Sequence, residues 1–177
     1  VNIYVEEGSV SRIKEINIVG NKLYEKEDLM ELFKLKVTNL LSWYNKDDRY
    51  SKQVLSGDLE GLRSFYMDRG YLDFKINSSL IRISENKKHV YVDISLNEGN
   101  KYFFGESTIS GKLNDDVSKE DLELQIGTHK GEVFSRSQVT LTTGRMNQIL
   151  GNKGYAFSNA NAIPEVDKEE RTVSFNY

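Results

Sequence analysis

The chain repeats itself at a fixed interval, and this repeat limits the folds open to it more than any other feature. Val1–Gly8 (VNIYVEEG) reappears as Val92–Gly99 (VDISLNEG), 91 residues further along. The same interval carries Glu15–Gly20 onto Glu106–Gly111, so a strand, a turn and a second strand recur as one unit. A sequence of this kind is an array of similar modules, each built around its own small core.

The repeat also predicts where the modules begin and end. We expect residues 1–8 to be the last strand of a truncated preceding module, residues 9–99 to be a complete module, and residues 100–177 to be a second, nearly complete one. Modules of about 80 to 90 residues are small but can fold without disulfides. None can form here, because the chain contains no cysteine.

The composition argues against several classes of function. The 24 basic and 27 acidic residues give a formal net charge of -3, and neither sign forms the long runs typical of proteins that bind nucleic acid or membrane surfaces. Apolar residues never form an uninterrupted run near the ~20 residues that a membrane-spanning helix requires. We therefore expect no nucleic-acid partner and no membrane span within this chain.

Hydrophobic periodicity predicts the order of elements in the first complete module. Apolar residues recur at helical spacing in two segments and alternate with polar residues in the strands. The expected elements are a strand at 13–18, a short helix from Lys26, a longer helix from the N-cap Ser51 to a stop at Gly70, and an antiparallel hairpin of 72–83 with 90–96. The module therefore reads β-α-α-β-β.

The second module follows the same plan. Ser118–Asp121 resembles a capping box ahead of a short helix, and a longer helix and a hairpin follow it. Pro164, the only proline, falls in the first strand of that hairpin. Because proline cannot donate to a central ladder, we expect this strand to lie at the edge of its sheet.

Three stretches carry a resemblance to a known family: Ile16–Asn21 (INIVGN), Gly57–Tyr66 (GDLEGLRSFY) and Asp68–Tyr71 (DRGY). Over essentially the whole chain they resemble POTRA domains, with residues 9–99 similar to the third unit of bacterial outer-membrane barrel assembly factors and the later residues to the fourth. The resemblance implies an α+β fold of tandem β-α-α-β-β modules, each a three-stranded mixed sheet packed against two helices.

The resemblance also implies a function. It implies a periplasmic array ahead of a C-terminal membrane barrel in a Gram-negative bacterium. Such an array receives unfolded outer-membrane barrel proteins and docks accessory lipoproteins of the BamB kind. From the residues themselves we expect no enzyme activity, no cofactor and no metal site.

One strand of the first module is the expected binding element. In the family fold the strand from Tyr71 to Ile83 is an exposed edge, which offers unpaired backbone groups to an extended partner. Its apolar residues change phase near Ser78-Ser79, where a β-bulge would fit. Such a bulge and Lys75 equally suit protection of the edge from aggregation. The expected client edge comprises Leu72, Asp73, Phe74, Lys75, Ile76, Asn77, Ser78, Ser79, Leu80 and Ile81.

Two further sites follow from the resemblance. Residues at the end of the first helix bind the lipoprotein in the family, which points to Leu35 and Lys36 here. The nearby Trp43 is expected to cover the module's own core. The expected interdomain hinge comprises Glu98, Gly99, Asn100 and Lys101, where glycine permits either a fixed bend or a flexible joint.

Other functions fit the sequence less well. His89 and His129 fall in different modules without a matching set of metal ligands. The carboxylates at Asp47-Asp48 and in Asp167–Glu170 lie in polar segments, where solvated charge is usual. A POTRA array of a two-partner secretion or import pore, and a passive spacer scaffold, remain the alternatives.

Overall fold

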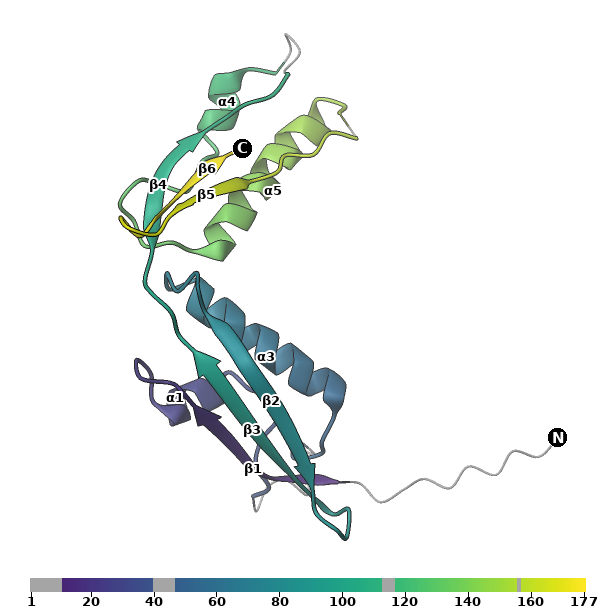
Figure 1. Ribbon diagram of the computed structural model, residues 1–177. Helices are drawn as coiled ribbons and strands as arrows, with labels where there is room; N and C mark the ends of the chain where they lie inside the picture. Colours follow the sequence, from purple (N-terminus) through teal and green to yellow (C-terminus); the bar gives the residue numbers. More distant parts are fainter. Residues whose placement is uncertain (1–10, 40–46, 113–116, 156) are drawn as a thin grey trace, which may run out of the picture. The chain divides into compact units, whose positions relative to one another are not determined.

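The computed structural model describes residues 11–39, 47–112, 117–155 and 157–177 (Figure 1). The chain forms two compact units. Unit 1 takes up Val1–Arg63 and Phe74–Glu98, and unit 2 takes up Ser64–Asp73 and Gly99–Tyr177. The strand expected over residues 1–8 lies outside the described residues, as does Trp43.

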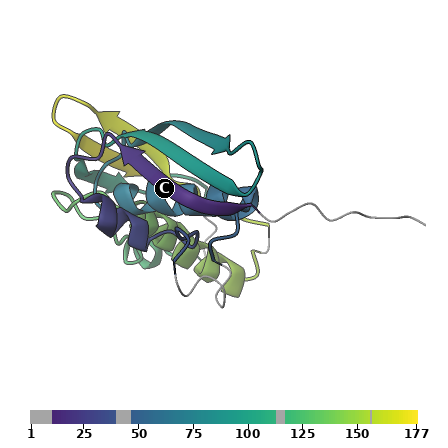
Figure 2. The ribbon, with the colours of Figure 1, turned by 90° about the horizontal axis from the view of Figure 1, so that it is seen from below.

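Unit 1 has the order β-α-α-β-β that the sequence predicts. Its elements are β1 (Arg12–Val19), α1 (Lys26–Glu31), α3 (Lys52–Met67), β2 (Lys75–Ile83) and β3 (His89–Asn97). The last turn of α3, from Ser64 onward, belongs to unit 2. The sheet order is β1-β3-β2, with β1 parallel and β2 antiparallel to the central β3. Both helices lie on one face of this sheet (Figures 1 and 2).

The core of unit 1 follows from the periodicity of its elements. Alternate residues of β3, including Ile94, are buried beneath the helices, and the residues between them face the open side of the sheet. In β1 the residues Ile13, Ile16 and Ile18 are buried, because the register with β3 shifts between Ile13 and Glu15. The hydroxyl of Ser51 accepts a hydrogen bond from the amide of Val54 and caps α3. The helix is followed by Gly70 at a φ of 97°, a conformation that favours glycine.

The phase change expected in β2 is confirmed. The register between β2 and β3 shifts between Ile76, which pairs with Leu96, and Ser78, which pairs with Ser95. Because of this extra residue, Ile76 and Ile81 lie on the same side of the sheet despite their odd spacing.

Unit 2 repeats the arrangement. Its elements are β4 (Phe103–Thr108), α4 (Lys119–Glu123), α5 (Arg136–Asn152), β5 (Ile163–Asp167) and β6 (Thr172–Asn176). The sheet order is β4-β6-β5, with β4 parallel and β5 antiparallel to β6. Pro164 therefore lies on an edge strand, as predicted. The hydroxyl of Ser118 accepts from the amide of Asp121 and caps α4.

Aromatic rings dominate the core of unit 2. Phe104, Phe134 and Phe175 contact one another, with ring centroids 5.5 to 6.3 Å apart. Tyr177 stacks on Phe175 at 6.0 Å. Burial of these large rings is the main stabilising contribution that a module of this size can have. Among the described residues, no helix combines the length and apolar character needed to cross a membrane.

Candidate functional site

The outer side of β1 is already covered by unit 1 itself. The amide of Ile13 donates to the carbonyl of Asp48 at 2.7 Å, and the carbonyl of Ile13 accepts from the amide of Thr38 at 2.9 Å. The amide of Tyr50 bonds to the carbonyl of Ser11 at 3.0 Å. The first residues of β1 therefore have backbone partners on both sides, which closes this part of the edge to another strand.

The corresponding strand of unit 2 is covered in the same way. The amide of Phe104 donates to the carbonyl of Glu132, and its carbonyl accepts from the amide of Gly131, both at 2.8 Å. The amide of Phe134 bonds to the carbonyl of Tyr102 at 3.0 Å. The loop before α5 thus acts as a short extra strand beside β4.

β2 forms a long sheet edge that no other segment of the described chain covers. Within the described parts of the chain, no backbone hydrogen bond joins the outer side of its nine residues to another segment. Eight of the nine residues are exposed, and three of these are apolar: Leu80 at 58%, Ile81 at 37% and Ile83 at 57% exposure. A strand with unpaired amides and exposed apolar side chains can bind an extended peptide.

The sheet face next to this edge is polar. Arg82 forms an ion pair with Asp93 at 2.7 Å and lies over the ring of Tyr91, 5.7 Å from its centroid. Both partners belong to β3 on the side away from the helices. The open face is polar around Arg82, although Leu80 and Val19 on the same face are 58% and 49% exposed. Only the edge adds unpaired backbone groups to such apolar side chains.

The outer hairpin strand of unit 2, β5, offers a partner strand fewer backbone groups than β2 does. β5 has five residues where β2 has nine, and Pro164 removes one amide donor from it. All five residues are exposed, with Ile163 at 62% and Val166 at 41%. A partner strand could form fewer hydrogen bonds here than along β2.

Leu35 does not lie where a lipoprotein could contact its side chain. It is a core residue at 2% exposure, and its amide donates to Oδ2 of Asp58 at 3.0 Å. The expectation that Leu35 contacts a partner directly therefore does not fit this structure, because the turn after α1 directs the side chain into the core. Lys36 is partly exposed, and its Nζ donates to the carbonyl of Met30 at 2.9 Å.

Asp58 is a residue that sequence reasoning did not single out. It lies on α3 at 3% exposure, and its two carboxylate oxygens accept from the amides of Lys34 and Leu35 at 2.9 and 3.0 Å. Thr142 occupies the matching place in unit 2, where its hydroxyl accepts from the amide of Gly127 at 3.1 Å. The available signal was an acidic residue three positions after Leu55, within the buried stripe of α3.

The expected hinge residues are divided between the two units. Glu98 belongs to unit 1, where its carboxylate accepts from the amides of Lys22 and Leu23 at 3.0 and 3.1 Å. Gly99 belongs to unit 2 and has a φ of 74°. A Cβ at Gly99 would lie 2.7 Å from the Cβ of Asp73, so the position requires glycine.

Tyr102, close to these residues in the chain, has a raised pKa. Its hydroxyl donates to Oδ2 of Asp73 at 2.8 Å, and the residue is buried within unit 2. The hydrogen bond to Asp73, helped by burial and by the negative charge of that carboxylate, raises the pKa of Tyr102 above its usual value of 10.0.

The expectation of solvated charge at Asp48 is wrong, because this side chain is fully buried. Its Oδ2 accepts from Nη1 of Arg12 at 2.8 Å and from the hydroxyl of Thr38 at 3.0 Å, whereas its Oδ1 and Oδ1 of Asp47 have no hydrogen-bond partner among the described residues. Oδ1 of Asp167 accepts from the amides of Glu169 and Glu170 in the β5–β6 turn. Within the described residues no cluster of three potential metal ligands occurs.

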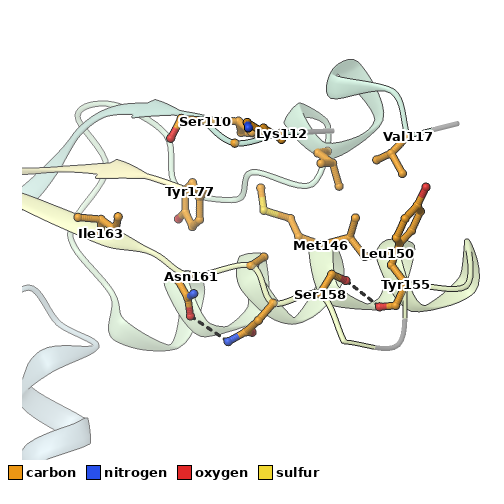
Figure 3. Close-up of a pocket in the computed structure, with 15 residues that line it drawn as sticks. Ser110, Lys112, Val117, Met146, Leu150, Tyr155, Ser158, Asn161, Ile163 and Tyr177 are labelled. Carbon is orange, nitrogen blue, oxygen red and sulfur yellow. Dashed lines mark hydrogen bonds between the residues drawn. The ribbon is translucent and has the colours of Figure 1, made fainter. Parts of the chain in front are cut away.

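A cavity of about 460 Å³ lies in unit 2, bordered by the apolar side chains of Met146, Leu150 and Tyr177 (Figure 3). Gly111 lines it, and a Cβ there would meet nothing within 4 Å. Its counterpart in unit 1, Gly20, is closely approached by the carbonyl oxygen of Leu96, which would lie 2.0 Å from a Cβ. In the first repeat, therefore, the end of the central strand fills this place, and we assign no ligand to the cavity.

Comparison with known proteins gives the family. The POTRA family, described as a surface antigen variable number repeat, matches residues 11–99 and 102–177. The outer membrane protein assembly factor BamA of Neisseria meningitidis is 29% identical over 99% of this chain, and BamA of Buchnera aphidicola is 27% identical over all of it. The chain spans 22% and 28% of the length of these two relatives.

A solved structure agrees with the fold. The crystal structure of Haemophilus influenzae BamA POTRA3-5 is 22% identical and superimposes with a TM-score of 0.81, covering 99% of this chain and 68% of that one. Haemophilus ducreyi BamA lacking POTRA domains 1-3 matches with a TM-score of 0.67 at 21% identity, covering 94% of this chain and 28% of that one.

Proposed function

Because this chain belongs to the POTRA family, whose domains are periplasmic, we propose that it serves an outer-membrane protein assembly factor by binding unfolded barrel-protein segments along β2. The observation that carries the proposal is the uncovered edge itself. Of the two hairpin edges, β2 is the longer, and Ile81 and Ile83 leave apolar surface along it. The segments bind by adding a strand to the sheet.

The strength of such binding suits a transient client. A backbone hydrogen bond contributes only about 0.5 to 1.5 kcal/mol net, so four or five of them contribute a few kcal/mol before the peptide's ordering cost. This corresponds to a dissociation constant on the order of millimolar. Weak binding that depends little on sequence lets the array receive many different barrel proteins and release them again.

Docking of an accessory lipoprotein at the end of α1 is the second part of the proposal. Lys36 is partly exposed, and two apolar residues near it, Leu32 and Val37, are 37% and 38% exposed. The exposed apolar side chains give a partner surface to bury, and the aliphatic stem of Lys36 can extend it. Leu35 contributes by fixing the backbone of this turn through Asp58.

An amide NMR titration tests the binding edge. A peptide copied from a barrel strand is added to the fragment, and the shifts along β2 are compared with those along β5. We expect the shifts to concentrate on β2, with half-saturation in the millimolar range. A passive spacer would leave both edges unchanged at several millimolar peptide, and that result would refute client binding by this fragment.

A further inference from the structure

Two backbone hydrogen bonds at the start of β3 show which way each backbone amide of β2 points. The amide of Ser84, just after β2, donates to the carbonyl of His89 in β3 at 2.9 Å. On the other side of β3, the carbonyl of Lys88 accepts from the amide of Arg12 in β1 at 2.9 Å. Odd-numbered residues of β3 therefore bond toward β2, and even-numbered ones bond toward β1.

This pattern extends along β2 without a break as far as Ser78, because the pairing shows no register shift between Ser78 and Ile83. In an antiparallel pair, hydrogen-bonded residues alternate with residues whose amides point away from the partner strand. Leu80 and Arg82 pair with odd-numbered residues of β3, so their amides face inward. The amides and carbonyls of Ser79, Ile81 and Ile83 consequently face the open edge.

The same three residues direct their side chains toward the helix-covered side of the sheet. Ile81 is paired with Val92 and Ile83 with Val90, and both valines are buried beneath the helices. Side chains of directly paired residues lie on one face. The outward amides and the exposed isoleucine side chains therefore belong to the same residues, which fixes how a partner must be patterned.

The bulge sets the length of the usable edge. On its far side the pairing of Ile76 with the even-numbered Leu96 makes Ile76 the outward-facing residue. Ile76 and Ser79 are three residues apart, whereas a regular added strand pairs at every second residue. A strand in phase with Ser79, Ile81 and Ile83 is thus out of phase at Ile76.

We propose, building on the proposed function, that β2 selects amphipathic strands, binding about five residues opposite Ser79–Ile83 with every second side chain apolar and packed beside Ile81 and Ile83. Strands of membrane barrels alternate apolar and polar residues in this way. The occupant is therefore an unfolded barrel strand, read by its alternation and not by its exact sequence. A segment whose apolar residues are consecutive satisfies the hydrogen bonds but places only part of its apolar surface beside the isoleucines.

Hydrogen exchange, measured without any ligand, tests which backbone amides of β2 face the open edge. We expect the amides of Ser79, Ile81 and Ile83 to exchange at least about tenfold faster than those of Leu80 and Arg82, because only the latter are bonded to β3. Uniform exchange along the strand would overturn the inference while leaving the proposed function standing.

Synthetic peptides then test the selection. An alternating peptide of Val, Ile, Thr and Ser should bind at least about fivefold more tightly than a peptide of the same composition with its apolar residues consecutive. In an added strand only every second residue directs its backbone amide toward β2. N-methylation of those peptide amides should abolish binding, and N-methylation of the amides between them should be tolerated, whether the peptide binds parallel or antiparallel. Equal affinity of the two peptides, or equal loss at both sets, would overturn the inference.

A matched pair of variants and a dilution series complete the test. The double variant Ile81→Thr/Ile83→Thr should weaken the alternating peptide at least about fivefold, whereas Leu80→Thr, on the opposite face, should change it less than about twofold. Equal effects would overturn the assignment of the apolar side. If raising the fragment concentration alone protects the amides of Ser79, Ile81 and Ile83, the occupant is a second copy of the chain, which also overturns the proposal.

Discussion

Replacing Asp58 by alanine should destabilise unit 1 more than replacing an exposed acidic residue of the same helix would. Both carboxylate oxygens of Asp58 accept backbone hydrogen bonds, from the amides of Lys34 and Leu35, and the side chain is 3% exposed. The variant would leave both amides without their acceptor. The Leu35 amide is buried, whereas Lys34 is an exposed residue whose bond to Asp58 is only partly buried.

The size of the loss can be worked from these contacts. A buried donor left without a partner costs about 1–3 kcal/mol, which applies in full to the Leu35 amide. Water can replace part of the bond at Lys34, so the two losses together come to about 1–4 kcal/mol. Domains are stable by only about 5–15 kcal/mol in total, so a large part of the stability of unit 1 is at stake. Asp58→Asn keeps one acceptor oxygen and should lose about half as much.

Urea unfolding followed by amide NMR measures this prediction, because each unit has its own cross-peaks. The control is Glu60→Ala on the same helix, where an exposed carboxylate lies 3.3 Å from Arg63 and should contribute at most about 1 kcal/mol. If Asp58→Ala and Glu60→Ala lowered the free energy of unfolding equally, the reasoning about buried amides would be refuted.

Two other predictions concern the turn after α1 and Tyr102. Leu35→Ala should lower the free energy of unfolding of unit 1 by about 2–5 kcal/mol. Lys36→Glu should lower it by at most about 1.5 kcal/mol, because it loses only the bond to the carbonyl of Met30, and should weaken capture of a BamB-like lipoprotein in a pull-down. The reverse pattern would contradict the burial of Leu35. Because the folded pKa of Tyr102 is raised, its stabilisation is complete below the unfolded pKa of 10.0 and is lost as pH rises through the folded value. Stability measured above about pH 10 should therefore fall more steeply in the wild type than in Tyr102→Phe; parallel curves would count against the bond to Asp73.

The repeat and the periodicity were sufficient to predict the elements of each module. Alternation in residues 90–96 identified a strand, and the phase change near Ser78 identified the bulge, because both follow from the strand period of two. The missing amide of Pro164 identified an edge strand, whereas the order of strands in each sheet was implied by the resemblance to POTRA domains. The strand, the bulge and the position of Pro164 at an edge depend only on which residues are neighbours along the chain.

The features that failed or were missed depend on contacts between distant residues. The side chain of Leu35 was expected at a surface, but its burial is set by the turn that Asp58 holds from 23 residues away. Asp68, within the DRGY motif, accepts from the amide of Ser137 at 2.7 Å, at the start of α5. Tertiary hydrogen bonds of this kind leave no periodic signal in one sequence.

Site-specific photo-crosslinking in living bacteria that carry this chain tests the central claim most directly. A photoreactive residue is placed at Ile83 on β2 or, as the matched control, at Glu165 on β5, while the cell synthesises a barrel protein. Both positions are exposed edge residues. The account predicts crosslinks to the unfolded barrel protein from position 83 and few from position 165. Equal crosslinking from both positions, or none from position 83 while barrel assembly proceeds normally, would contradict it.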